Sequence, residues 1–91
     1  MTINGRSLNI ARCSSFIERA KGLIGKESLA ENEGLLIPHC NLVHTFFMRF
    51  PIDCYFLGKH DEVVKVVRNV PPWRLFVWGG WKARSVVEVQ A

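Results

Sequence analysis

The chain has 91 residues, which fit one domain around one modest core and exclude a second domain. Its 48% hydrophobic and 22% charged residues exclude a disordered protein, and its formal net charge of +4 suits loose association with an anionic partner. Because no run approaches the roughly 20 apolar residues of a membrane helix, and no apolar run follows the N-terminal charge, we expect a soluble, cytoplasmic single domain over residues 1–91.

The N-terminal third predicts one strand and one helix. Residues 3–12 alternate loosely between apolar and polar after an Asn-Gly turn signal, which favours a first strand. Ser15 and Glu18 have the spacing of a capping box, which predicts the start of a helix. Apolar residues then recur at helical spacing up to Gly25, so this segment is the principal helix of the predicted fold.

The middle of the chain is strongly apolar and predicts strands. Residues 35–37 form a short buried strand that Pro38 stops, because proline lacks the backbone donor of a ladder. Residues 42–50 and 52–57 are rich in Phe, Val, Ile and Tyr, which is typical of half-buried strands. Pro51 separates these two predicted strands.

The C-terminal part predicts a hairpin, a stiff loop and a final strand. A turn at residues 58–61 leads to a returning strand at 63–67, and the Pro-Pro pair within 69–74 gives an extended loop. An aromatic segment ending in two glycines then precedes a final strand at 83–89. We therefore predict an α+β fold, a small curled, mainly antiparallel β-sheet or partial barrel with one principal N-terminal helix.

Separated segments of the chain resemble one known family. They are ERAKGLIG at residues 18–25, GLLI at 34–37 and TFFMRFPID at 45–53, in the order and spacing of the domain-of-unknown-function family numbered 192. The pattern continues in residues 63–67, 69–74 and 83–89, so the resemblance covers the chain from about residue 13 to 91.

The resemblance implies a small β-rich, barrel-like domain of bacteria and archaea without an established biochemical activity. Similar members usually continue past the last strand into a Gly-containing segment and one further strand. We therefore expect this chain to lack the family's C-terminal extension, which would leave a sheet edge open to pairing.

Arg49 and Asp53 lie in the family-like centre and are the first candidate site residues. An arginine on a strand among aromatic residues needs a partner, and Asp53 follows the bend at Pro51. The favoured interpretation is an ion pair that locks the turn; the alternative is that both side chains face a cleft and bind a polar ligand.

His44, Cys40 and Cys54 are weaker candidates for chemistry. Their types suit a metal ion, but the spacing matches no zinc motif, so we expect no metal and no cofactor. A Cys-His pair could act as a nucleophile and its base, yet no nucleophile elbow, paired-carboxylate signature or phosphate loop accompanies them. The three cysteines of the chain are expected to be free thiols in a reducing compartment.

Trp73 and Arg74 belong to a basic stretch, residues 68–84, that contains all three tryptophans. Tryptophans beside arginines can stack on bases while the cations neutralise phosphates, although no nucleic-acid motif supports this use. The alternative interpretation is that the tryptophans cover one end of the barrel under Arg and Lys stems. Residues 63–87 have no acidic member; their cations are Lys65, Arg68, Arg74, Lys82 and Arg84.

These observations favour a non-enzymatic binding or interaction module whose partner is an acidic protein or an anionic ligand. It would use a cleft near Arg49 and Asp53 or the surface of the loop that carries Trp73 and Arg74. The alternatives are a small thiol- or metal-dependent hydrolase, and nucleic-acid binding through the basic C-terminal third. The sequence gives no oligomeric state.

Overall fold

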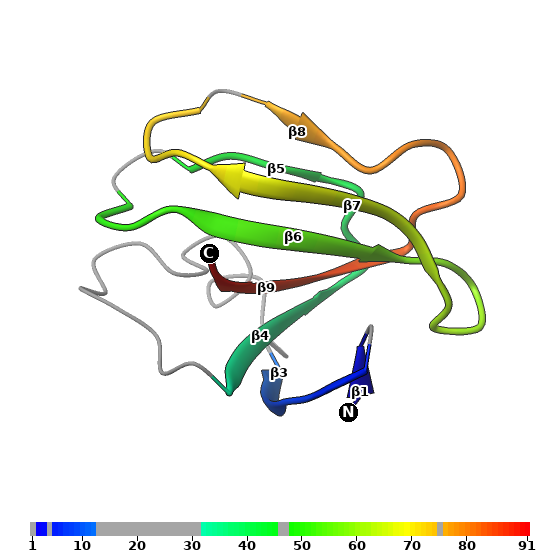
Figure 1. Cartoon of the computed structure of the whole chain (residues 1–91). Helices are drawn as coiled ribbons and strands as arrows, with labels where there is room; N and C mark the ends of the chain where they lie inside the picture. Colours follow the sequence, from blue (N-terminus) through cyan, green and yellow to red (C-terminus); the bar gives the residue numbers. More distant parts are fainter. Residues whose placement is uncertain (1, 4, 13–31, 46–47, 75) are drawn as a thin grey trace.

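The computed structural model describes residues 2–3, 5–12, 32–45, 48–74 and 76–91. Its strands are β1 (Thr2–Ile3), β2 (Arg6–Ser7), β3 (Asn9–Arg12), β4 (Glu33–Pro38), β5 (Leu42–Val43), β6 (Ile52–Leu57), β7 (Val63–Val70), β8 (Val77–Trp78) and β9 (Ser85–Gln90). A five-stranded sheet has the order β3-β4-β9-β6-β7, and two further ribbons pair β1 with β2 and β5 with β8 (Figure 1).

The predicted α+β class is wrong, because every regular element in these ranges is a strand. The class depended on the helix predicted from Ser15 to Gly25, which lies outside the described residues. The sheet is also mixed, since β3 runs parallel to β4 while the other neighbours in it are antiparallel. In the part of the chain that the structure describes, no helix is long and apolar enough to cross a membrane.

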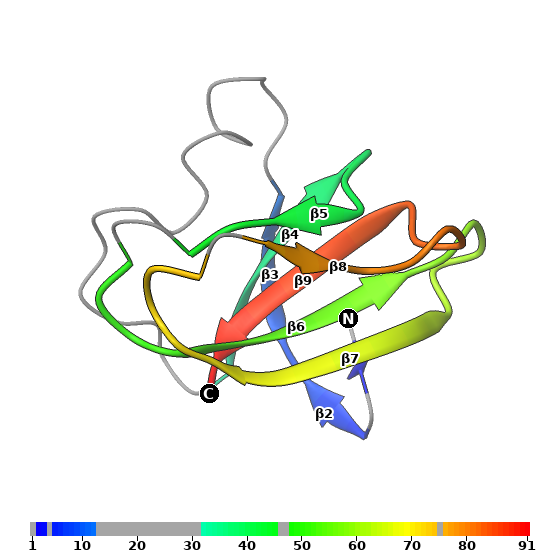
Figure 2. The ribbon, with the colours of Figure 1, turned by 90° about the horizontal axis from the view of Figure 1, so that it is seen from above.

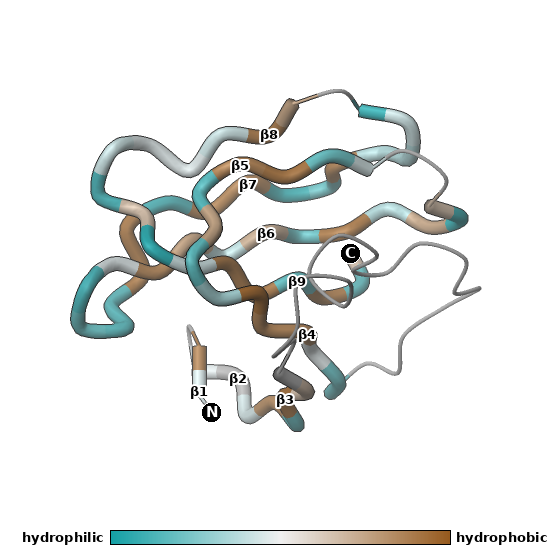
Figure 3. Tube along the Cα trace, turned by 180° about the vertical axis from the view of Figure 1, so that it is seen from behind, coloured by the Kyte–Doolittle hydropathy of each residue, from teal (hydrophilic) through white to brown (hydrophobic). Residues whose placement is uncertain are grey.

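The central strands β6 and β9 are buried on both faces, which explains the apolar runs along them (Figure 3). On one face of β6, Cys54 and Phe56 pack in a core that includes Val43 of β5 and Val77 of β8. On the other face, Tyr55 packs in a core that includes Ile3 of β1 and Leu8, which follows β2. Figure 1 shows the β5–β8 ribbon on one side of the sheet and the N-terminal ribbon on the other.

The predicted hairpin of β6 and β7 is confirmed. The two strands pair antiparallel from Ile52 with Val70 to Leu57 with Val63, with two shifts of register that mark bulges. Figure 2 shows β7 at the edge of the sheet, while β9, the C-terminal strand, runs through its middle.

Of the strand predicted over residues 42–50, the described residues 42–45 and 48–50 contain only the two residues of β5. After β5 the chain turns, and the Met48 N–H donates to the Thr45 carbonyl at 3.2 Å. Thr45 bonds with the loop at residues 71–74, far away in sequence, so tertiary contacts override the strand propensity of this apolar stretch.

Candidate binding pocket

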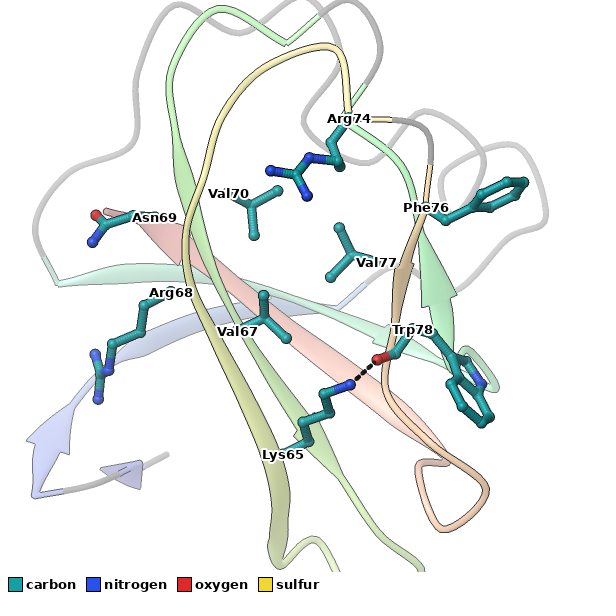
Figure 4. A pocket seen from close by; sticks show the side chains of 9 residues that line it. All are labelled: Lys65, Val67, Arg68, Asn69, Val70, Arg74, Phe76, Val77 and Trp78. Atoms are coloured by element: carbon teal, nitrogen blue, oxygen red, sulfur yellow. Dashed lines mark hydrogen bonds between the residues drawn. The ribbon is translucent and has the colours of Figure 1, made fainter.

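A pocket of about 210 Å³ opens between β7 and β8. It has an apolar floor and a cationic rim, and Figure 4 shows it from close by. Its lining residues are Lys65, Val67, Arg68, Asn69, Val70, Arg74, Phe76, Val77 and Trp78.

Lys65 reaches across the pocket because of its place in β7. It pairs in register with Phe56 of β6, a core residue of the face that β8 covers, and directly paired residues point to the same face of a sheet. Its Nζ donates to the Trp78 carbonyl of β8 at 2.8 Å (Figure 4). A single side-chain bond therefore links two strands that do not pair with each other.

Asp53, a predicted site residue, is not among the described residues that line the pocket. It instead forms a hydrogen bond with the end of β7 where the pairing with β6 is bulged. The residue is only 8% exposed. Its carboxylate accepts the Asn69 N–H at 2.8 Å and lies 3.6 Å from the Arg68 guanidinium. Arg68 also donates to the Tyr55 hydroxyl at 3.2 Å and lies over its ring. Its side chain extends to the side of β7 away from the pocket (Figure 4).

Arg49, the predicted partner of Asp53, is exposed and also absent from the described lining. The ion pair that the structure gives Asp53 is with Arg68. Neither Arg49 nor Asp53 is therefore among the described residues that line the pocket.

Thr45 organises the loop that carries Trp73 and Arg74. The fully buried Thr45 hydroxyl donates to the Pro71 carbonyl and accepts the Arg74 N–H, both at 2.7 Å. Its backbone accepts the Trp73 N–H at 2.7 Å and donates to the Arg74 carbonyl at 3.0 Å. These bonds hold Trp73 at a φ of 67°, with 58% of its surface exposed, and place Arg74 at the pocket.

An apolar surface beside the pocket, which we name the aromatic face, consists of Leu42, Phe76, Trp78 and Trp81. Their exposed fractions are 46%, 63%, 43% and 83%, in that order. Leu42 and Trp78 are direct partners in the β5–β8 ribbon, and the rings of Trp78 and Trp81 meet edge to face with centroids 5.2 Å apart. Clustered exposed aromatic residues mark interaction sites more often than single ones.

The charged side chains that line the pocket in the described residues are all cationic. No acidic side chain is among its described lining residues, and in the described part of the chain neither Lys65 nor Arg74 forms an ion pair. An unneutralised cation at a surface attracts anionic groups, and aromatic neighbours lower the local dielectric constant. The pocket can therefore bind a ligand that combines carboxylates with apolar groups.

The cysteine candidates lie elsewhere. Cys54 is fully buried, and this burial, together with the nearby Glu88, raises the pKa of its thiol, so Cys54 stays protonated and is a poor nucleophile. The Cys40 thiol donates to the Leu42 carbonyl at 3.2 Å. This geometry does not favour thiol chemistry.

Cys40 lines a second pocket, of about 260 Å³, with the neighbouring His39 and with Arg84. His44, the remaining candidate of this kind, is exposed. Among the described residues, no three His, Cys, Asp or Glu side chains come together in a group that could hold a metal ion.

Glu88 was not singled out by the sequence. It lies on the central strand β9, opposite Leu35 on one side and Cys54 on the other, and only 3% of it is exposed. Burial raises the pKa of the Glu88 carboxyl to about 7. A single charged residue within an otherwise apolar strand is the sequence signal that could have identified it.

Of the predicted site residues, only Arg74 is among the described residues that line the pocket between β7 and β8. The sequence did not identify Thr45, Lys65 or Phe76 as site residues. Lys65 could have been found from the acid-free stretch to which it belongs, whereas the role of Thr45 depends on a contact across 26 positions of the chain.

The described residues define a small β-sheet fold whose regular elements are all strands, with an open cationic and aromatic surface. The chain belongs to the family DUF192, described as uncharacterized ACR, whose model matches residues 1–91. No curated protein matches the chain.

Two solved structures share the fold. A protein of unknown function from Novosphingobium aromaticivorans matches with a TM-score of 0.78 and 23% identity, over 90% of this chain and 61% of that chain. A protein from Sinorhizobium meliloti, named a "putative transcription regulator", matches with a TM-score of 0.84 and 17% identity, over 92% of this chain and 69% of that chain. This chain thus spans less than two thirds of the Novosphingobium protein.

Proposed function

We propose that this protein is a non-enzymatic interaction module that binds an acidic segment of a partner protein at the pocket and the adjoining aromatic face. The observation that carries the proposal is the pairing of two cations, Lys65 and Arg74, with exposed aromatic residues around a pocket whose described lining has no acidic member.

Charge and apolar surface each support one part of this proposal. Carboxylates of a partner would neutralise Lys65 and Arg74, which speeds association and selects against basic partners. Phe76 and Trp78 supply apolar area of the kind that carries most of the affinity in protein interfaces. An acidic segment with interspersed apolar side chains satisfies both requirements.

A protein segment suits this pocket better than a nucleic acid does. The edge-to-face packing of Trp78 and Trp81 turns their rings against each other, whereas base recognition uses ring faces on which successive bases stack. The floor of the pocket consists of Val67, Val70 and Val77, which pack on aliphatic side chains. We further expect the module to act in the cytoplasm, where its cysteines stay reduced.

Selection from a displayed library of random octapeptides tests the proposal. The wild-type protein should enrich peptides rich in Glu and Asp with apolar residues between them. The Lys65→Gln/Arg74→Gln variant should lose this enrichment, while the control Lys59→Gln/Arg84→Gln, which removes the same charge at exposed positions absent from the described lining of the pocket, should retain it.

Two results would contradict the proposal. One is enrichment without an acidic bias, or equal enrichment by the pocket variant. The other is the absence of any enriched peptide together with salt-sensitive binding of oligothymidylate, which would make the surface a nucleic-acid site.

A further inference from the structure

Trp73 has a backbone conformation that disfavours large side chains. Its φ of 67° lies in the left-handed region, where the Cβ of an L-residue comes too close to the carbonyl oxygen that follows it. Apart from glycines, the other described residues with positive φ are His39, Asp61 and Asn69. Histidine, aspartate and asparagine are the types that adopt this region most readily. Trp73 is therefore the exception in this set, and its conformation costs free energy of folding.

The environment of Trp73 explains its backbone conformation but not its side chain. Thr45 fixes the loop at residues 71–74 through hydrogen bonds to backbone groups. Asparagine or glycine would meet this backbone requirement with less strain. The tryptophan is also 58% exposed, so it buries less than half of its surface against the protein. A large exposed ring at a strained position points to a use in recognition.

Trp73 is placed to contact the same partner as the pocket. It directly precedes Arg74, which lines the pocket, so the two Cα atoms are about 3.8 Å apart. Figure 4 shows the Arg74 side chain extending from this loop toward the pocket. A carboxylate bound to Arg74 therefore brings the neighbouring residues of the same peptide close to Trp73. A tryptophan on a fixed backbone loses little conformational entropy on binding, and such residues carry much of the affinity of protein interfaces.

We infer that Trp73 is an anchor of this interaction, which binds a large apolar side chain next to the acidic residue that Arg74 holds. This inference rests on the proposed function, because it specifies which residue beside the pocket selects the sequence of the partner. Lys65 and Arg74 select for charge, whereas Trp73 selects for an apolar neighbour. A variant that relieves the backbone strain but lacks the ring should therefore fold well and bind weakly.

Fluorescence anisotropy of two labelled octapeptides tests the inference. Each peptide has six glutamates; one has two leucines at its centre and the other has two serines there, so their charges are equal. The wild-type protein should bind the leucine peptide roughly tenfold more tightly than the serine peptide. Trp73→Asn should lose this preference, with a roughly tenfold weaker affinity for the leucine peptide and an unchanged affinity for the serine peptide.

Trp73→Ala is the matched control that separates the ring from the backbone. It also lacks the ring, but it keeps a residue type that disfavours positive φ. In thermal unfolding its midpoint should lie about 4 °C below that of Trp73→Asn. The two variants should nevertheless bind the leucine peptide equally weakly, because both lack the ring.

Two results would overturn the inference. One is a Trp73→Asn variant that keeps the leucine preference of the wild type. The other is binding that follows stability, with the leucine peptide bound more tightly by Trp73→Asn than by Trp73→Ala, because the ring would then act only through the loop. The proposed function stands in both cases if Lys65→Gln/Arg74→Gln weakens binding of both peptides. If the wild type binds neither peptide, the proposed function fails together with the inference.

Discussion

Thr45 shows at the scale of one residue how the candidate site is built. A single buried hydroxyl serves both as a donor to Pro71 and as an acceptor from Arg74. Both partners belong to the loop that presents Trp73, so the loop conformation depends on a residue outside it. A threonine at this position supplies the hydroxyl in a fixed rotamer, because its branched Cβ restricts rotation.

We predict that Thr45→Val destabilises the protein by about 1–3 kcal/mol, because the isosteric side chain removes two hydrogen bonds to part-buried backbone groups, each worth about 0.5–1.5 kcal/mol. Urea unfolding measures the change. Thr45→Ser keeps the hydroxyl and should lose distinctly less. Equal losses in the two variants would show that the hydroxyl bonds do not hold the loop.

At the scale of elements, the β5–β8 ribbon lies so close to the sheet that only glycine fits at its end. The Gly79 N–H donates to the Asn41 carbonyl at 2.7 Å and extends the ribbon by one bond beyond β8. A Cβ at Gly79 would collide with the ring of Phe56, which is fully buried in β6. This contact fixes the distance of the aromatic face from the core.

We predict that Gly79→Ala costs about 1–3 kcal/mol by overpacking. Phe56→Leu should recover part of that loss in the double variant, since the smaller side chain vacates the space; a thermodynamic cycle of urea unfolding measures this coupling. Gly80→Ala is the neighbouring control. Its Cβ would meet nothing within 4 Å, but its φ of 92° is left-handed, so it should lose about 1 kcal/mol and show no coupling to Phe56.

At the scale of the whole molecule, Glu88 makes folding depend on pH. The carboxyl lies in the central strand, so only opening of the sheet exposes it fully. Burial raises its pKa from 4.5 to about 7, which means that the folded protein binds the proton more tightly than the unfolded chain. The stabilisation is therefore complete below pH 4.5 and is lost as the pH rises through 7.

We predict that the Glu88 contribution to the free energy of unfolding falls by about 3 kcal/mol between pH 4.5 and pH 8. Urea unfolding across this range should show the decline in the wild type and its absence in Glu88→Gln. Asp61→Asn, at an exposed turn, is the control and should keep the wild-type profile. A Glu88→Gln profile that still declines as steeply would falsify this assignment.

Local sequence signals predicted several strands correctly but predicted the wrong fold class. The turn at residues 58–61 and the apolar runs beside it predicted the β6–β7 hairpin, because strand pairing across a short turn depends on neighbouring residues. The α+β class came from a local helix pattern outside the described residues. The run at 42–50 also predicted too long a strand, because the partners of Thr45 are distant in sequence and leave no local signal.

Residue order and composition alone were enough to predict the family, the β6–β7 hairpin and the location of the unbalanced positive charge. Those features follow from residue order and composition, which act over a few positions. Three features became known from the folded chain alone: β9 lies between β4 and β6, Asp53 pairs with Arg68, and Lys65 and Arg74 line one pocket. The physical reason is that sheet order, bulges and ion pairs depend on contacts between distant segments, each of which has several competing partners until the whole chain packs.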